Sequence, residues 1–155
     1  MIKGKSKNHQ PNDQPILSVL LFRSRFARAK RMAKIVVIDD EPAMLRVTCR
    51  TLQAAGHKVV AFANGRGGIE HCRKETPDLL LTDIFMPEME GLETIQTAHR
   101  LRPEMPIIAM SGMSFDGGDY LHIAERFGAI ATLKKPFRRS ELIELVSRLL
   151  APPHN

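Results

Sequence analysis

The hydrophobic pattern of the chain repeats five times from Lys34 onwards: a short apolar run is followed each time by a longer stretch of mixed polarity. Short, nearly continuous apolar runs are typical of strands that are buried on both faces. We expect strands at 34–38, 58–62, 78–82, 106–110 and 130–134. The stretches between them predict amphipathic helices at about 42–55, 65–75, 91–101, 119–127 and 139–150.

Alternation of this kind predicts a doubly wound α/β domain over about 34–150, with a parallel sheet covered by helices on both faces. Pro42 suits the first turn of the first helix, and Gly56 suits its C-terminal end. Gly67 and Gly68 fall inside the second helix, where each costs about 1 kcal/mol relative to Ala. We therefore expect that helix to be short or to start late.

The positive charge of the chain is concentrated before this domain. Residues 1–33 contain eight of the 23 basic residues but one of the 17 acidic residues, which gives them a net charge of +7 and the remainder −1. Residues 1–15 are almost without apolar side chains, so we expect residues 1–33 to form a basic, disordered extension. Residues 151–155 are expected to be a short tail after the domain.

The extension also contains the apolar run ILSVLLF at 16–22. This run is far shorter than the roughly 20 residues of a transmembrane helix, and arginines follow it instead of a signal-peptide cleavage site. An interfacial basic helix, a nucleic-acid-binding arm and a segment without a folded role all remain open, and we favour the last. Cys49 and Cys72 have no metal-ligand spacing and are expected to be buried thiols in a cytoplasmic protein.

Polar side chains follow four of the five predicted strands. Because the carboxyl ends of parallel strands meet at one edge of a sheet, these residues are expected to lie together. They are Asp39, Asp40 and Glu41 after the first strand, Asp83 after the third, Ser111 after the fourth and Lys135 after the fifth.

Carboxylates that converge on one point repel one another unless a cation lies among them, and hard oxygen ligands favour Mg²⁺ or Mn²⁺. A divalent cation beside a lysine and a hydroxyl can hold a phosphoryl group, whose transfer depends on positioning and charge neutralisation. An aspartate can itself be the nucleophile that accepts the group. Taken alone, each acid could equally favour a helix N-terminus or cap a loop, but together they favour phosphoryl transfer.

Four segments then give a specific resemblance: KIVVIDDEPAMLR, LLLTDIFMPEMEGLE, PIIAMSG and LKKPF, in that order along residues 34–150. The chain resembles the receiver domain of bacterial response regulators, and most of all the single-domain, chemotaxis-regulator-like members. The resemblance implies a flavodoxin-like (βα)5 receiver fold whose five-stranded parallel sheet has the order 2-1-3-4-5.

The resemblance also implies roles for individual residues. Asp83 is then the phospho-acceptor. Asp40 is a direct metal ligand, Asp39 binds the metal directly or through water, and the backbone carbonyl of Phe85 is a further ligand. Mg²⁺ is the expected ion, with Mn²⁺ as an alternative.

Ser111 stands at the position of the switching Ser or Thr of the family, and Lys135 at that of its lysine, with a cis bond expected between Lys135 and Pro136. Lys134 is interpreted as the end of the strand. One position departs from the family pattern, because Thr132 occupies the place of an aromatic residue that normally moves with the Ser or Thr. Coupling through an aromatic rotamer is therefore not expected here.

These assignments predict a stand-alone response regulator of a two-component phosphorelay, which accepts a phosphoryl group from a histidine kinase or a histidine phosphotransfer protein. No C-terminal, DNA-binding output domain is expected, so the output is protein contact or use as a phosphate sink. The expected contact face, also a candidate homodimer face, comprises residues 119–127, 130–134 and 139–150.

Two other functions were weighed. The alternative is a receiver-like interaction module that works independently of phosphorylation, for which Thr132 is the support. A hydrolase with an aspartate nucleophile needs a second acid two residues after it, and Phe85 occupies that position. We therefore expect a phospho-accepting signalling protein that at most catalyses its own phosphorylation and dephosphorylation.

Overall fold

The computed structural model describes residues 32–87, 91–112 and 120–152 of the 155-residue chain. Most of the expected extension at 1–33, part of the expected tail at 151–155 and most of the loop after Ser111 lie outside the described residues. Both terminal segments therefore stay predictions.

Five parallel strands form one sheet, and all five were predicted. They are β1 (Lys34–Ile38), β2 (Lys58–Phe62), β3 (Leu79–Asp83), β4 (Ile107–Ser111) and β5 (Ala131–Lys134). Their order across the sheet is β2-β1-β3-β4-β5, which confirms the expected receiver topology. The sheet therefore has β3 at its centre and the two edge strands β2 and β5 furthest apart.

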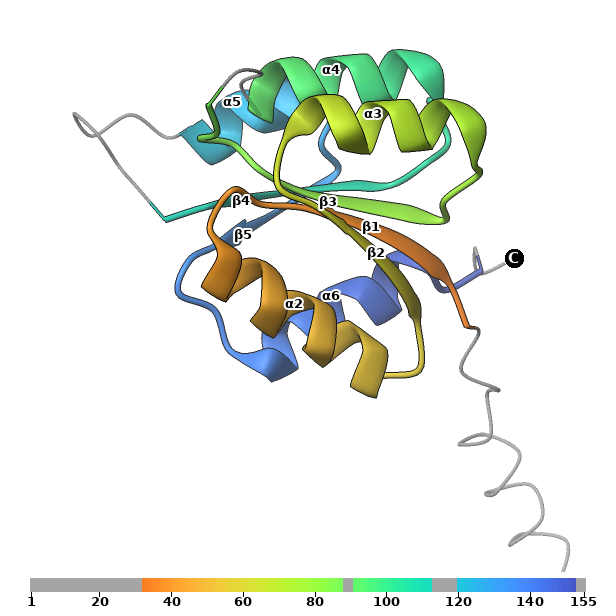
Figure 1. The fold of residues 1–155 in the computed structure, drawn as a ribbon, viewed down its shortest axis with the longest axis vertical. Helices are drawn as coiled ribbons and strands as arrows, with labels where there is room; N and C mark the ends of the chain where they lie inside the picture. The colour runs from red at the N-terminus through yellow and green to blue at the C-terminus, as the bar shows by residue number, and fades with distance from the viewer. Residues whose placement is uncertain (1–31, 88–90, 113–119, 153–155) are drawn as a thin grey trace, which may run out of the picture. The chain divides into compact units, whose positions relative to one another are not determined.

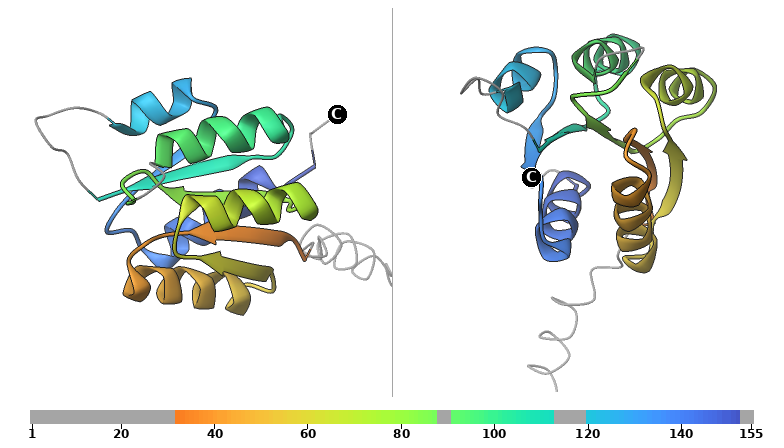
Figure 2. Two further views of the ribbon diagram at one scale, coloured as in Figure 1. Left: turned by 45° about the horizontal axis from the view of Figure 1, so that its top comes forward. Right: turned by 60° about the vertical axis from the view of Figure 1, so that its left-hand side comes forward.

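Five helices cover the two faces of this sheet (Figures 1 and 2). They are α2 (Pro42–Ala54), α3 (Gly65–Lys74), α4 (Gly91–Leu101), α5 (Tyr120–Arg126) and α6 (Arg139–Leu149). Helices α3, α4 and α5 lie on one face, and α2 and α6 lie on the other. Among the described residues, no helix has the length and apolar character needed to cross a membrane.

Side-chain alternation along the central strands builds two separate cores. In β3, Leu80 packs in the core below α3 and α4, whereas Leu79 and Leu81 pack in the core below α2 and α6. All three leucines are fully buried. Because both faces are covered, the strands are apolar throughout, which is why the sequence showed continuous apolar runs instead of alternation.

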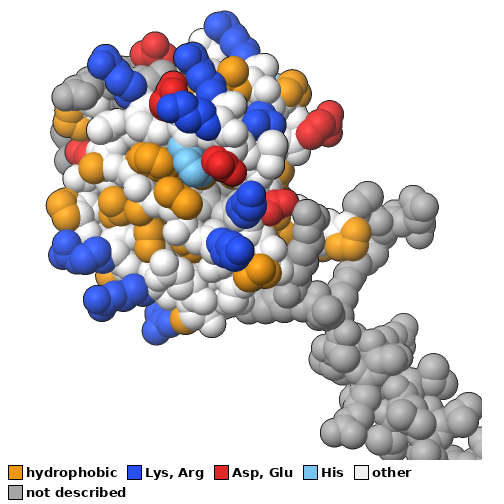
Figure 3. Space-filling model, turned by 45° about the vertical axis from the view of Figure 1, so that its right-hand side comes forward, with side chains coloured by type: hydrophobic (Ala, Val, Ile, Leu, Met, Phe, Trp, Pro, Cys, Tyr) orange, Lys and Arg blue, Asp and Glu red, His pale blue; other side chains and the backbone are white. Residues whose placement is uncertain are grey.

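Exposed apolar side chains are spread over the described surface. The large ones are Met32, Val47, Val60, Leu101 and Ile130. They belong to different elements, and scattered apolar residues of this kind are normal for a globular domain. Figure 3 shows one face on which hydrophobic side chains gather beside a histidine, bordered by charged side chains.

The predicted bounds of three strands were wrong by one residue: β5 begins at Ala131 instead of residue 130, and β3 and β4 are each displaced by one position along the chain. β3 begins at Leu79 and ends at Asp83, and β4 begins at Ile107 and ends at Ser111. Pro106 has no amide proton to donate to the sheet, although its carbonyl accepts a hydrogen bond from the Leu80 amide at 3.0 Å. As a consequence, Asp83 and Ser111 are the last residues of their strands and share the rigidity of the sheet.

The expectation of a short or late second helix was also wrong, because α3 starts at Gly65 and contains both glycines. The Asn64 side chain caps it by accepting a hydrogen bond from the Gly67 amide at 2.8 Å. A Cβ on Gly68 would overlap the side chain of Ile38 and lie 2.7 Å from its Cγ1. Close packing of the helix on β1 therefore outweighs the low helix propensity of glycine.

Gly68→Ala tests whether this close approach determines the residue. In an open helix the change would raise the free energy of unfolding by about 1 kcal/mol. Here we expect it to fall by about 1–3 kcal/mol, because the added methyl group overpacks the contact with Ile38. Urea denaturation measures the difference, and an increase in stability would contradict this explanation of α3.

Candidate functional site

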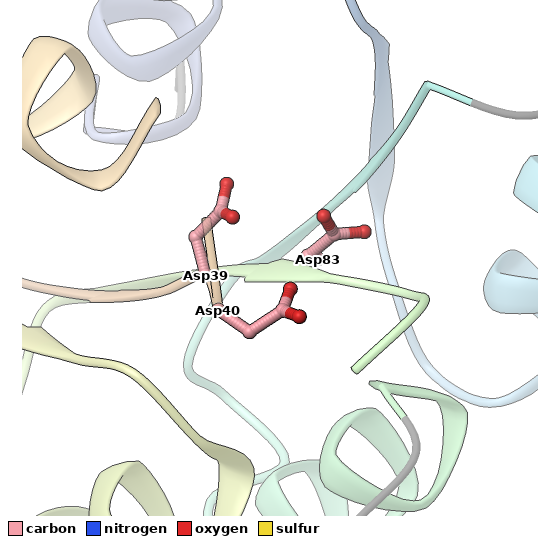
Figure 4. Close-up of side chains that lie close together, drawn as sticks. All are labelled: Asp39, Asp40 and Asp83. Carbon is pink, nitrogen blue, oxygen red and sulfur yellow. The ribbon is translucent and has the colours of Figure 1, made fainter. Parts of the chain in front are cut away.

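Three aspartates meet at the edge of the sheet where the central strands end. Asp39 and Asp40 directly follow β1, and Asp83 ends β3. One carboxylate oxygen from each of the three lies within 4.8 Å of the others. Figure 4 shows these side chains gathered at the ends of the two strands. The acids that the sequence predicted to converge therefore do so.

Lys135 lies among these acids. Its Nζ donates to Oδ2 of Asp39 at 2.7 Å and to Oδ2 of Asp83 at 2.5 Å. Asp39 is fully buried, and Asp83 and Lys135 are 7% and 8% exposed. The two ion pairs are therefore shielded from water, which makes them stronger than pairs at the surface. Lys134, the alternative lysine, is an exposed strand end, as predicted.

Backbone amides orient the other oxygen of both buried carboxylates. Oδ1 of Asp39 accepts a hydrogen bond from the Glu41 amide at 2.9 Å, and Oδ1 of Asp83 accepts one from the Phe85 amide at 3.1 Å. Each carboxylate is thus held between Lys135 and a backbone amide two residues further along the chain. This arrangement fixes the direction of both side chains before any ligand binds.

Burial and pairing change the protonation equilibria of this group. Burial raises the pKa of the Asp39 carboxyl above its ordinary value, although hydrogen bonds from Lys135 and from the Glu41 amide oppose the change. Burial disfavours the charged form of Lys135, but its hydrogen bonds to Asp39 and Asp83 outweigh this and raise its pKa. Lys135 is therefore a permanent cation at neutral pH, and Asp39 is a costly buried charge.

Asp39 and Asp40 are adjacent but have different environments. Both oxygens of Asp39 accept hydrogen bonds, from Lys135 and from the Glu41 amide, whereas Asp40 is exposed. Glu41 precedes α2, and its described contribution to the site is its backbone amide. Asp40 is thus the member of the acidic pair that can reach an incoming cation most easily.

Ser111 completes the cluster at the end of β4. It is 3% exposed, and its carbonyl accepts a hydrogen bond from the Lys135 amide at 2.8 Å. The bond between Lys135 and Pro136 is cis, as expected. Ser111 and Lys135 are therefore joined through their backbones as well as placed at the same edge.

Thr132 and Phe85 lie beside the site without belonging to the acidic cluster. Thr132 is half-buried on β5, where it pairs with Ala109 of β4. Phe85 is half-buried and packs against the core below α3 and α4. The loop that follows Ser111 lies, beyond Gly112, outside the described residues.

Sequence analysis missed two residues that enclose the backbone of Asp83. The hydroxyl of Thr82, which is fully buried, donates to the Asp83 carbonyl at 3.0 Å. Gly91, the first residue of α4, donates its amide to the Ile84 carbonyl at 2.8 Å. A polar residue directly before the acid in an otherwise apolar strand was a signal for Thr82, whereas no local pattern indicated Gly91.

The fold and this edge cluster define a receiver domain, and comparison with known proteins agrees. The family profile described as response regulator receiver domain matches residues 35–147. The chain belongs to this family, whose members are signalling proteins of two-component systems that receive phosphoryl groups from histidine kinases or phosphotransfer proteins.

Two of the curated relatives differ greatly in length. Response regulator receiver protein CpdR of Brucella abortus is 32% identical over 119 residues, which is 77% of this chain and 98% of CpdR. DNA-binding transcriptional regulator NtrC of Escherichia coli K12 is 36% identical over 115 residues, which is 74% of this chain but 24% of NtrC. The chain therefore matches nearly all of one relative and about a quarter of the other.

Solved structures support the same family. A CheY-like receiver domain protein from Methanospirillum hungatei has a TM-score of 0.71 and 31% identity, covering 77% of this chain and 94% of that one. The BeF3-activated DrrB receiver domain has a TM-score of 0.70 and 28% identity, covering 77% and 98%. Both similarities extend over most of the described domain.

Lys135→Met tests how strongly the cluster depends on its buried cation. The change removes the charge and leaves Asp39 uncompensated, so we expect the free energy of unfolding at pH 7 to fall by about 3 kcal/mol. Chemical denaturation measures the loss. Adding Asp39→Asn should recover part of it, because that change removes the unpaired charge.

The matched control is Lys134→Met at the exposed neighbour, for which we expect a change within about 0.5 kcal/mol. The penalty of Lys135→Met should be smaller at pH 4 than at pH 7, because burial raises the pKa of Asp39 and its protonation stabilises the folded state as the pH falls. Equal losses in the two lysine variants would contradict the ion-pair explanation.

Proposed function

We propose that Asp83 accepts a phosphoryl group from a phosphohistidine of a histidine kinase or histidine phosphotransfer protein. A carboxylate oxygen of Asp83 attacks phosphorus, the bond between phosphorus and the histidine nitrogen breaks, and an acyl phosphate forms as the imidazole leaves. The observation that carries this proposal is the placement of Asp83 at the strand end, held between Lys135 and the Phe85 amide.

A divalent cation fits the donors of this site. Receiver domains bind Mg²⁺ at an acidic pocket, and three carboxylates within 4.8 Å supply the hard oxygen ligands that Mg²⁺ or Mn²⁺ prefers. We propose Asp40, Asp83 and the Phe85 carbonyl as ligands, with Asp39 as a direct or water-mediated one. The bound ion would neutralise negative charge on the phosphoryl oxygens.

Ser111 and Lys135 are proposed to receive the phosphoryl group once it is attached. A lysine ammonium and a hydroxyl can both donate to phosphoryl oxygens. Lys135 already contacts Oδ2 of Asp83, and Ser111 is joined to Lys135 through the backbone. Movement of these two residues towards the phosphoryl group is thus the proposed first step of signalling.

We further propose that the protein is a stand-alone, cytoplasmic response regulator. Its proposed output is contact with another protein or use as a phosphate sink. The match over 98% of CpdR supports the stand-alone form. The proposed contact face comprises α5, β5 and α6, and a second copy of the chain is one candidate partner for it. In α6, Leu142, Leu145 and Val146 are core residues, whereas Ile143 and Leu149 are half-buried.

Asp83→Asn tests the phospho-acceptor. Acetyl phosphate with Mg²⁺ should label the wild-type chain on Asp83, and the label should be absent from the variant because an amide cannot form the acyl phosphate. Intact-mass measurement followed by peptide mapping detects the added phosphoryl group, and chelation of the metal should also prevent labelling.

Asp78→Asn is the matched control, since Asp78 lies just before the opposite end of the same strand and bonds the Lys34 amide there. This variant should be labelled like wild type. Undiminished labelling of Asp83→Asn on another residue would show that the acceptor is misassigned.

A second candidate function is a receiver-like interaction module that phosphorylation does not control. Thr132, a small side chain at the position of the family's moving aromatic residue, is the observation that favours it. Beryllofluoride, which mimics the phosphoryl group, distinguishes the two functions in an NMR titration with Mg²⁺. We expect shifts at Ser111 and in α5, and unchanged spectra there would favour the inert module.

A further inference from the structure

Residues of two elements, β3 and α4, donate hydrogen bonds to the backbone carbonyls of Asp83 and Ile84. Thr82, the preceding residue of β3, donates its hydroxyl to the Asp83 carbonyl at 3.0 Å. Gly91 of α4 donates its amide to the next carbonyl, that of Ile84, at 2.8 Å. Two consecutive carbonyls beside the proposed acceptor are therefore held from within the strand and from the neighbouring helix.

The contact with Gly91 leaves no room for a side chain. A Cβ on this residue would overlap the Asp83 carbonyl oxygen and the Cα of Ile84, and would lie 2.6 Å from the Ile84 carbonyl oxygen. All three neighbours are backbone atoms, which cannot rotate away as the end of a flexible side chain can. Any larger residue must therefore displace either the start of α4 or the backbone of Asp83 and Ile84.

The sheet restrains this backbone from the side of β4. The Ile84 amide donates to the Met110 carbonyl at 2.9 Å, which continues the pairing of β3 with β4 beyond Asp83. Thr82, Ile84 and Gly91 are all buried. These buried hydrogen bonds thus determine the direction in which the chain leaves β3.

That direction determines two features of the proposed reaction. The Phe85 amide, which bonds Oδ1 of Asp83, comes two residues later, and so does the Phe85 carbonyl proposed as a metal ligand. A rotation of the peptide after Asp83 would move both groups relative to the Asp83 carboxylate. Errors of about 1 Å in such a geometry can reduce rates by about a hundredfold.

We infer that Thr82 and Gly91 are positioning residues for phosphoryl transfer to Asp83. Thr82 sets the orientation of the Asp83 peptide by its hydroxyl, and Gly91 permits α4 to begin against that peptide. The inference rests on the proposed function, since it assumes that Asp83 is the acceptor. It adds two residues that contact neither the metal nor the phosphoryl group in the proposed mechanism.

Thr82→Val and Thr82→Ser test the hydroxyl in the full-length chain. Valine has nearly the shape of threonine without its donor, and serine restores the donor. With saturating acetyl phosphate and Mg²⁺, we expect the labelling rate of Thr82→Val to fall about threefold to tenfold, as for loss of one hydrogen bond. Thr82→Ser should label within about twofold of wild type, because its donor is retained.

Gly91→Ala tests the close approach, with Gly128→Ala as its control. Gly128 has a φ of +115°, and a Cβ there would lie 2.6 Å from Cγ of His99, so its replacement is strained as well. Gly128 comes shortly before the amino end of β5, whereas the aspartates lie at the carboxyl ends of β1 and β3. We expect the rate per folded molecule to fall at least about tenfold in Gly91→Ala and to stay unchanged in Gly128→Ala.

Circular dichroism gives the folded fraction by which each rate is divided. Wild-type rates in Thr82→Val, or equal rates in the valine and serine variants, would overturn the role of the hydroxyl. Equal effects of the two glycine replacements would overturn the role of Gly91. If Gly91→Ala does not fold, the threonine pair still decides the inference. A wild-type chain that is not labelled on Asp83 would instead refute the proposed function, and this inference with it.

Discussion

The buried ion pairs of Lys135 with Asp39 and Asp83 are the interaction on which the rest of the site depends. They join residues 96 and 52 positions apart in the chain, so they form only when β1, β3 and β5 have taken their places in one sheet. Two carboxylates with 0% and 7% exposure would be unstable without a cation between them. The fold thus creates the acidic cluster, and Lys135 makes the cluster compatible with the fold.

Much of this could be predicted from the sequence, because the strongest signals are local. Short apolar runs located all five strands, and the rule that parallel strands end at one edge was sufficient to predict that Asp39, Asp83, Ser111 and Lys135 lie together. The family resemblance supplied the strand order and the cis bond. These features need only pattern and topology, which a single sequence contains.

The features that were missed depend on distances between elements. Glycine is found at position 68 of α3, despite its low helix propensity, because Ile38 leaves no space for a side chain there. Gly91 has no space for a side chain either, because the backbone atoms of Asp83 and Ile84 lie against it. The different environments of Asp39 and Asp40 likewise depend on which carboxylate faces Lys135. One-residue errors at the ends of β3 and β4 arose because an apolar pattern does not indicate which backbone amide makes the final ladder bond.

The small exposure of Asp83 has a consequence for the shape of any protein that delivers the phosphoryl group. Asp83 is 7% exposed, so in the proposed reaction phosphorus can approach its carboxylate from only a narrow range of directions. The donor histidine is therefore expected to project beyond the surface of its own protein, so that its phosphoryl group can reach the Asp83 carboxylate. In that reaction, a phosphohistidine that lies below the surface of its own protein could not make this approach, whatever the charge of that protein.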